Sequence, residues 1–259
     1  MIPLVRPALP RERLHGLRQI VRFNWPYYVV GTVAAAAAPP IAWTLPVTSN
    51  AMLTIAYCGS ALACLWILGS LAASWIVYDR SSLMSGTWIR EALGYRPHSW
   101  ISIHAGFDEM TPILRGLFEG SRGRGIDIYE AEEMTEGSIG RARRVLPAHG
   151  AQPARFDNLP AGSDSLDAVF VLLSAHELRS HAARLALFDE IRRATKPGGR
   201  VIVAEHLRDA ANFVAFGPGF LHFHSRHAWT RCFSDARFGI YDEFAITPFV
   251  RVFVLRRLP

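Results

Sequence analysis

Residues 104–130 gather side chains and backbone features that could bind a nucleotide. An alternating apolar and polar stretch, Trp100–His104, breaks at Gly106. Glycine lets a ligand approach the backbone closely, and the start of the helix that follows, which Asp108 can cap, offers unpaired N–H groups. A carboxylate at the end of the next strand would suit the two hydroxyls of a ribose. The pattern is typical of a nucleotide site at the carboxyl edge of a parallel sheet.

Two carboxylates compete for the ribose position. The second apolar stretch reads Gly125-Ile-Asp-Ile-Tyr-Glu130, so its strand could end at Asp127 or at Glu130. We prefer Glu130, because a strand that stopped at Asp127 would be barely two residues long. The carboxylate that does not bind the ribose is then a solvated or structural residue.

Histidines provide the second group of chemically active side chains. His176 follows a strongly apolar strand, where a neutral imidazole could take a proton from a hydroxyl or thiol; a histidine that only hydrogen-bonds the strand end is the alternative. His222, His224 and His227, with Trp229, lie in an apolar segment before the last strands. No cysteine or pair of acidic residues lies at a metal-ligand spacing from these histidines in the sequence, so we expect no metal site there. We expect this segment to cover a substrate or to face a membrane.

The first eighty residues predict a membrane hairpin. No charged side chain occurs between Arg22 and Asp79, and a polar break divides this interval into Trp25–Leu45 and Ala51–Tyr78. Each half exceeds the roughly 20 apolar residues that cross a bilayer core, and aromatic residues stand at the outer ends. We therefore predict two antiparallel transmembrane helices over residues 24–79. A cleaved signal peptide and a buried helical hairpin of a soluble protein are the alternatives.

The flanking charges predict the orientation of this hairpin. Five arginines precede the first helix, Arg80 follows the second, and the turn between them has none. By the positive-inside rule, both termini and the soluble domain are cytoplasmic, at a membrane of the bacterial inner-membrane type. We expect residues 1–23 to form a basic amphipathic segment and residues 80–97 an interfacial connector. Small residues in the second helix could also pair helices between chains, giving a homo-oligomer.

Composition narrows the functional classes. The three cysteines form no CxxC pair, which favours a reducing compartment over a disulfide framework. The net charge is +6, but many arginines flank the uncharged interval, where a membrane explains them equally well. No interleaving of aromatic and basic residues suggests a nucleic-acid groove, so we expect no nucleic-acid partner.

Residues 98–259 alternate strands and helices joined by short links. This alternation predicts an α/β domain with a doubly wound, mostly parallel sheet. The last two strands are separated only by Thr247-Pro248, so they form a hairpin that closes the sheet with an antiparallel strand. Beyond residue 130, we expect helices over 131–145 and 182–195, and strands over 152–156, 168–173, 200–205, 240–246 and 249–255.

Three motifs in the same domain carry a family resemblance. They are Asp157-Asn-Leu-Pro followed by Asp164-Ser-Leu-Asp-Ala-Val, then Lys196-Pro-Gly-Gly, then Ala236-Arg-Phe-Gly. In this order they resemble class I S-adenosylmethionine-dependent methyltransferases of the branch that acts on quinones and small molecules. The resemblance implies a seven-stranded Rossmann-like sheet and S-adenosylmethionine as cofactor. The loop after the strand that ends at His104 departs from the family pattern. Only Gly106 remains of the family's glycine loop, and His104 replaces an acidic residue.

The resemblance also implies roles for individual residues. His176 would be catalytic, and Glu130 or Asp127 would bind the ribose. Asp157 would meet the adenine amino group, unless it only forms a turn. The remaining cofactor-binding residues would be His104, Gly106, Phe107, Asp108, Asn158, Leu159 and Ser174, and the substrate would contact His222, His224 and Trp229.

We therefore expect a membrane-anchored methyltransferase that acts on an apolar small molecule at the cytoplasmic face. The anchor would hold the site beside a substrate that partitions into the lipid bilayer. The alternative is a non-catalytic membrane protein whose methyltransferase-like domain serves as a binding or assembly module. The reduced glycine loop motivates this alternative, and the carboxylates at two strand ends count against it.

Overall fold

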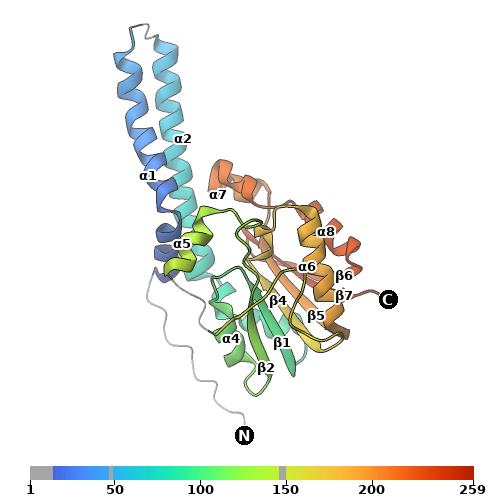
Figure 1. The fold of residues 1–259 in the computed structure, drawn as a ribbon. Helices are drawn as coiled ribbons and strands as arrows, with labels where there is room; N and C mark the ends of the chain where they lie inside the picture. Colours follow the sequence, from blue (N-terminus) through green and yellow to red (C-terminus); the bar gives the residue numbers. More distant parts are fainter. Residues whose placement is uncertain (1–13, 47–48, 146–149) are drawn as a thin grey trace.

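The structure, a computed structural model, describes residues 14–46, 49–145 and 150–259. Two long antiparallel helices, α1 (His15–Thr44) and α2 (Asn50–Trp75), stand away from an α/β domain (Figure 1). The predicted helical hairpin is therefore present. Part of the predicted N-terminal segment lies outside the described residues. Its remainder belongs to α1, which starts at His15 and continues past Arg22 without a break, and the boundary at residue 23 stays a prediction.

The foot of the hairpin is fastened by one carboxylate. Helix α2 continues into a π-helical turn, η1 (Ile76–Arg80), which contains Asp79. The Asp79 carboxylate accepts hydrogen bonds from the backbone N–H groups of Gly16 and Leu17, each at 2.8 Å. It therefore caps the start of α1 and also complements the positive end of that helix.

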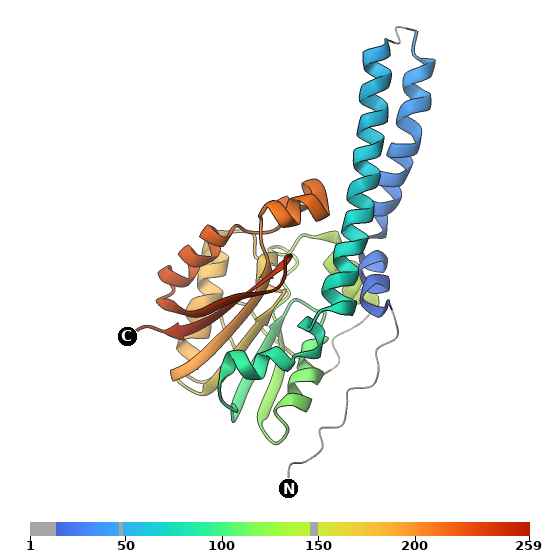
Figure 2. The same cartoon turned by 180° about the vertical axis from the view of Figure 1, so that it is seen from behind.

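The connector between the hairpin and the sheet lies against the sheet. It contains η2 (Leu83–Ser85) and α3 (Thr87–Leu93), and it crosses one face of the sheet (Figure 2). Trp88, Ile89 and Leu93 are buried in the apolar cluster on that face. These three side chains therefore face the sheet, and the interfacial position of the connector stays a prediction. Their apolar stripe is removed from water by the sheet itself.

Seven strands form one sheet in the order β3-β2-β1-β4-β5-β7-β6. Strands β1 to β5 pair in parallel, and β7 pairs antiparallel with both β5 and β6, which confirms the predicted fold class. The chain winds outward from β1 in one direction and from β4 in the other, so the two central strands mark the topological switch point. The strands are β1 (Ser99–His104), β2 (Arg122–Asp127), β3 (Gln152–Pro153), β4 (Leu166–Leu172), β5 (Thr195–His206), β6 (Phe238–Thr247) and β7 (Val250–Arg257).

Both faces of the sheet are apolar and covered. Along β4, Val169 and Val171 point into one buried cluster, whereas Ala168 and Phe170 point into the other. This arrangement explains why β4 reads as a continuous apolar run. The domain's helical elements are α4 (Met110–Leu117), α5 (Gly137–Val145), η3 (Ala175–Glu177), α6 (His181–Ala194), α7 (Ala210–Phe216), η4 (Gly217–His222) and α8 (Arg226–Asp235).

Three predicted boundaries are wrong for local reasons. Helix α5 starts at Gly137, because the chain first makes a turn in which the N–H of Met134 donates to the Glu130 carbonyl. Strand β3 has only two residues, and the second is Pro153, which has no N–H to donate. Strand β2 begins earlier than expected, at Arg122, and is six residues long although it ends at Asp127.

Candidate active site

A cavity of about 790 Å³ lies between the helical hairpin and the carboxyl edge of the sheet. Ala105 and Phe107 approach it from the loop after β1, and Ser174 and His176 from the loop after β4. The cavity therefore opens at the topological switch point, where α/β sheets usually bind ligands. The hairpin contributes Phe23, Tyr27, Tyr28, Trp66, Ile67 and Ser70, and the segment after β5 contributes Phe216, Leu221, His222 and Phe223.

The turn after β1 is organised from beneath by His104. Gly106 has a φ of +100°, a conformation that favours glycine, and its N–H donates to His104 Nδ1 at 3.1 Å. Asp108 accepts a hydrogen bond from the N–H of Thr111 at 2.8 Å, so it caps α4 as expected. Burial lowers the pKa of His104, which favours its neutral, hydrogen-bonding form. Of this turn, Phe107 faces the cavity, whereas His104 is buried below it.

An arginine covers the glycine turn. Arg143 of α5 places Nη1 2.9 Å and 2.7 Å from the two carboxylate oxygens of Asp127. Its guanidinium carbon lies 4.2 Å from the ring centre of Tyr129. A Cβ atom at Gly106 would come within 1.9 Å of Arg143 Nη1. The space in front of both the glycine and the β2 carboxylate is therefore taken by one side chain.

The predicted ribose and adenine carboxylates lie beside a second arginine. Arg155 pairs with Asp157 through two bonds of 2.9 Å and approaches Glu130 Oε2 at 3.7 Å. The N–H of Asn158 donates to the Arg155 carbonyl, so these residues form a tight turn, while Leu159 is buried in the core. Glu130 was preferred because a strand that ended at Asp127 seemed too short. That argument was wrong, because β2 begins at Arg122 and ends at Asp127.

His176 is held between two carboxylates at the edge of the cavity. Its Nδ1 lies 2.6 Å from Glu205 Oε2, and its Nε2 lies 3.3 Å from Glu177 Oε1. Glu205 ends the buried part of β5 and also accepts the N–H of Ala175 at 2.9 Å. Burial alone would lower the pKa of His176, but the charges of Glu205 and Glu177 outweigh it and raise the pKa to about 10. The two carboxylates therefore favour the protonated ring over the neutral imidazole that proton transfer would need, and the catalytic role of His176 stays a prediction.

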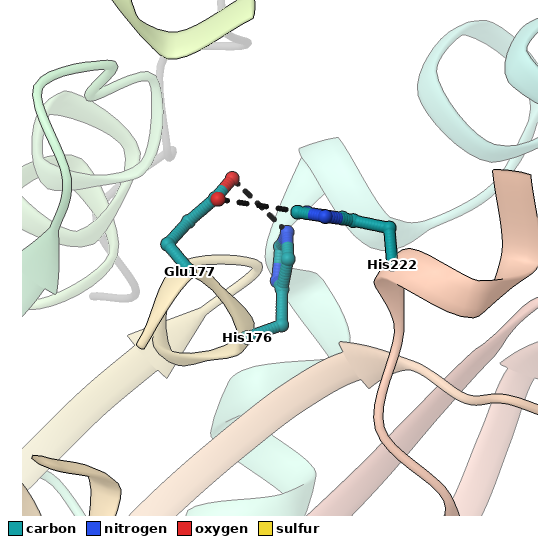
Figure 3. A group of neighbouring side chains, drawn as sticks. All are labelled: His176, Glu177 and His222. Atoms are coloured by element: carbon teal, nitrogen blue, oxygen red, sulfur yellow. Dashed lines mark ion pairs between the residues drawn. The ribbon is translucent and has the colours of Figure 1, made fainter. Parts of the chain in front are cut away.

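His222 joins this group from the far side of the cavity. Its Nε2 lies 3.5 Å from Glu177 Oε2, and its Nδ1 lies 3.1 Å from Glu136 Oε1. Figure 3 shows His176 and His222 pointing at the Glu177 carboxylate from two different segments. The ring centres of the two histidines are 5.2 Å apart, with their planes almost perpendicular.

Two predicted substrate residues point into the core instead. His224 Nε2 lies 2.8 Å from Arg184 Nη1, and Trp229 is fully buried with its ring stacked on Phe233. The prediction that His224 and Trp229 contact a substrate is therefore wrong. The reason is that α8 turns its apolar stripe toward α6, and His224 immediately precedes that helix.

Comparisons with known proteins agree with this fold. Residues 105–203 match the protein family described as a methyltransferase domain. The α/β domain therefore resembles methyltransferase domains over these residues. No curated protein sequence matches the chain. Among solved structures, a SAM-dependent methyltransferase from Aquifex aeolicus is 16% identical, with 68% of this chain and 93% of that chain covered and a TM-score of 0.51.

Two further structures share the methyltransferase fold. The pyocyanin biosynthetic protein PhzM is 18% identical, with 93% of this chain and 73% of that chain covered and a TM-score of 0.56. Geranyl diphosphate methyltransferase, solved with geranyl diphosphate and sinefungin, is 15% identical, with 73% of this chain and 81% of that chain covered and a TM-score of 0.50. At these identities the likeness shows the fold of the methyltransferase domain.

S-adenosylmethionine would reach the turn after β1 only if a single side chain moved. Gly106 leaves a cradle that lacks a Cβ, and Asp127 presents a carboxylate at the end of β2, but Arg143 lies across both. The Arg143 side chain is 32% exposed, and such a pair contributes about 0.2–1 kcal/mol. Glu130 Oε1, meanwhile, is buried and accepts no hydrogen bond from the described residues. Gly106, Asp127 and Glu130 do not themselves line the cavity, whereas Ala105 and Phe107, on either side of Gly106, do.

The sequence interpretation missed four polar residues around the methyltransferase site. They are Glu136, Arg143, Glu177 and Glu205. Glu205 had a detectable signal, because it follows an unbroken apolar run in β5, where a carboxylate needs a partner. Arg143 had none, since it is one of several arginines on a short helix of mixed polarity.

Proposed function

We propose that this protein is an integral-membrane methyltransferase that methylates an apolar small molecule at the cytoplasmic face of the membrane. The observation that carries the proposal is the shared cavity. One wall is the carboxyl edge of the methyltransferase sheet, and the opposite wall is the lower part of the hairpin. A substrate in this cavity would touch both.

The apolar surface of the hairpin supports insertion into a bilayer. Of the described helices, one stretch, Asn50–Ser85, is long and apolar enough to cross a membrane, with a mean hydropathy of 1.9 and none of its most apolar window buried. The neighbouring α1 exposes Val30 at 67% and Trp43 at 69%. Helix α2 is apolar enough to need a nonpolar environment, and α1 packs against it with these apolar side chains exposed. We infer that α1 crosses the membrane beside α2.

The length of α2 places the cavity near the membrane surface. About 20 residues span the hydrocarbon core, so a span that starts at Asn50 would end near Gly69. At that level α7 packs against α2, because a Cβ at Gly69 would lie 3.1 Å from the Ala215 carbonyl oxygen. Trp66, at the same level, lines the cavity. An apolar molecule could therefore pass from the bilayer into the site without crossing water.

The surrounding polypeptide supports this placement. Helix α7 exposes Phe213 and Val214, and Leu221 is exposed in η4, which is unusual for loops that face water. Aromatic and aliphatic side chains near the level of Gly69 in α2 suit the membrane interface. Arginines before α1 and after α2 support a cytoplasmic position of the α/β domain.

The chemistry needs few protein groups. S-adenosylmethionine, when bound, supplies an electrophilic methyl group. Asp127 would hold the ribose, and Phe107 and Ser174 would enclose the methionine portion at the end of the cavity nearest β1 and β4. The hairpin side chains would exclude water and align the acceptor atom with the methyl carbon, which supplies most of the rate enhancement in such a transfer. His176 would face the acceptor as a cation.

Cofactor binding tests this proposal. Calorimetry with S-adenosylhomocysteine on the detergent-solubilised protein should detect micromolar binding. Replacing Asp127 with alanine should weaken it about 10-fold to 100-fold, because a hydrogen bond to a charged group is lost. Glu130→Ala is the matched control and should change affinity less than about threefold. The opposite ranking would assign the ribose to Glu130.

The non-catalytic alternative has one observation in its favour, which is that Arg143 covers the glycine turn. If neither the natural protein nor Arg143→Ala bound S-adenosylmethionine or its product, that alternative would replace the proposal. If binding occurs, methyl-labelled cofactor and a native lipid extract should yield a labelled, organic-soluble product. Alkaline carbonate washing should leave the protein in the membrane pellet if the hairpin spans the bilayer.

A further inference from the structure

We infer that His176, Glu177 and His222 form a binding site for a divalent transition-metal ion, such as zinc, on the wall of the cavity. Two imidazoles and one carboxylate are a common ligand set for catalytic zinc. The inference does not depend on cofactor binding, since its evidence is the geometry of these three side chains.

The three side chains are already spaced like metal ligands. Metal–ligand bonds of about 2.0–2.1 Å in a tetrahedral site put ligand atoms roughly 3.4 Å apart. His176 Nε2 lies 3.3 Å from Glu177 Oε1, and His222 Nε2 lies 3.5 Å from Glu177 Oε2. One ligand atom from each residue falls within 4.8 Å of the others. A small rotation of the side chains would be enough to bring all three onto one ion.

Both histidines are oriented by carboxylates behind them. His176 Nδ1 faces Glu205 Oε2 at 2.6 Å, and His222 Nδ1 faces Glu136 Oε1 at 3.1 Å. His176 Nδ1 is therefore used for a carboxylate, whereas His222 Nδ1 lies near both Glu136 and Arg179 Nη1, the latter at 3.3 Å; Nε2 of each ring is left toward Glu177. A carboxylate on the outer nitrogen is the usual partner of a metal-bound histidine, because it fixes the ring and raises its basicity.

The charge balance also favours a cation at this position. Three carboxylates, Glu136, Glu177 and Glu205, surround the two rings, and Glu177 Oε2 is buried with no hydrogen bond from the described residues. Arg179 adds one positive charge beside His222. A divalent ion bound by the two rings and Glu177 would offset the negative charge of these carboxylates.

Three protein ligands leave at least one coordination position open. All three residues line the cavity, so the open position would be reached from the substrate side. An oxygen atom of the substrate could occupy it. This deepens the proposed function, on which this part of the inference rests, by selecting apolar molecules with an oxygen-bearing head group, such as a phenolate or an enolate.

Metal binding can be measured without any cofactor. The full-length protein, purified in detergent with a streptavidin-binding tag and stripped with chelator, would be titrated with ZnCl₂ by calorimetry and with CoCl₂ by visible absorption. We expect one high-affinity site per chain and a d–d absorption band of tetrahedral cobalt. His222→Gln and Glu177→Gln should each weaken zinc binding about 10-fold to 100-fold or more.

A matched control uses a histidine of the same segment. His227 is exposed on α8, so His227→Gln should leave zinc affinity unchanged. Thermal unfolding in detergent would confirm that each variant is folded. No stoichiometric zinc or cobalt binding to the natural protein would overturn the inference, and so would equal losses in His222→Gln and His227→Gln. Because S-adenosylhomocysteine binding is a separate titration, failure of either proposal is recognised independently.

Discussion

Replacing Arg143 with alanine should tighten binding of S-adenosylmethionine. In the structure, Arg143 occupies the space in front of Gly106 and pairs with Asp127, which is the carboxylate that ends β2. In the proposed function, the cofactor ribose binds to that carboxylate. The arginine must therefore give up its contacts before the nucleoside can bind, and the variant has no such contacts to lose.

The size of the effect follows from two contacts. A partly exposed arginine–carboxylate pair contributes about 0.2–1 kcal/mol. The contact of the Arg143 guanidinium with the Tyr129 ring, at 4.2 Å from its centre, contributes about 0.5–1 kcal/mol at an exposed site. Together they give about 0.7–2 kcal/mol, which corresponds to a dissociation constant roughly 3-fold to 30-fold lower in Arg143→Ala.

Isothermal titration calorimetry with S-adenosylhomocysteine in detergent would measure this change. Arg144→Ala is the control, because Arg144 is an exposed residue of the same helix. The affinity of Arg144→Ala for S-adenosylhomocysteine should equal that of the natural protein. Weaker binding by Arg143→Ala would refute the reasoning, because it would mean that the guanidinium moves to bind the cofactor, for example at its carboxylate.

Three other perturbations have defined outcomes. Asp79→Ala removes the carboxylate that caps α1 and should lower the free energy of unfolding in detergent by about 0.5–2 kcal/mol; an unchanged thermal midpoint would contradict this. Gly69→Leu should force α7 away from α2 and lower thermal stability, whereas Gly59→Leu, where no described atom lies within 4 Å, should not. Burial alone would raise the pKa of Asp167, but hydrogen bonds from Lys196, Ser99 and His98 outweigh it and lower the pKa to about 2. Because the pKa of Asp167 is lower in the folded than in the unfolded protein, this stabilisation is complete above about pH 4 and is lost toward pH 2. The free energy of unfolding of Asp167→Asn should therefore fall less steeply with decreasing pH in this range than that of the natural protein.

The sheet was predictable because its strands carry strong local signals. Strand β4 is a continuous apolar run, and both of its faces are buried, as such a run requires. The start of β2 could not be read, because Arg122-Gly-Arg-Gly has no apolar alternation, and its pairing depends on the neighbouring β1. The order of the strands followed from the fold resemblance, and the boundaries followed from hydrogen bonds between strands that the sequence does not contain.

The site was less predictable for a different reason. His176 was found because it follows a strand, but its charge depends on Glu205, which lies 29 residues later at the end of the neighbouring strand. His224 was misplaced because its direction is set by contact with Arg184 and by the packing of α8. Side-chain direction and ionisation are tertiary properties. Local spacing therefore identified the segments that reach the cavity and could not decide which side chains face it.

Contacts made by α5 and by Phe107 join the hairpin to the proposed cofactor site. Arg141 of α5 donates to the carbonyl oxygen of Phe23 in α1, and the Phe23 ring packs edge-on against Phe107 at 5.3 Å between centroids. Phe107 follows the glycine turn, and Arg143 stands two residues after Arg141. Any movement of α1 would therefore be transmitted both to the turn and to the arginine that covers it. Because the hairpin helices form part of the cavity wall, cofactor affinity should be measured on the full chain.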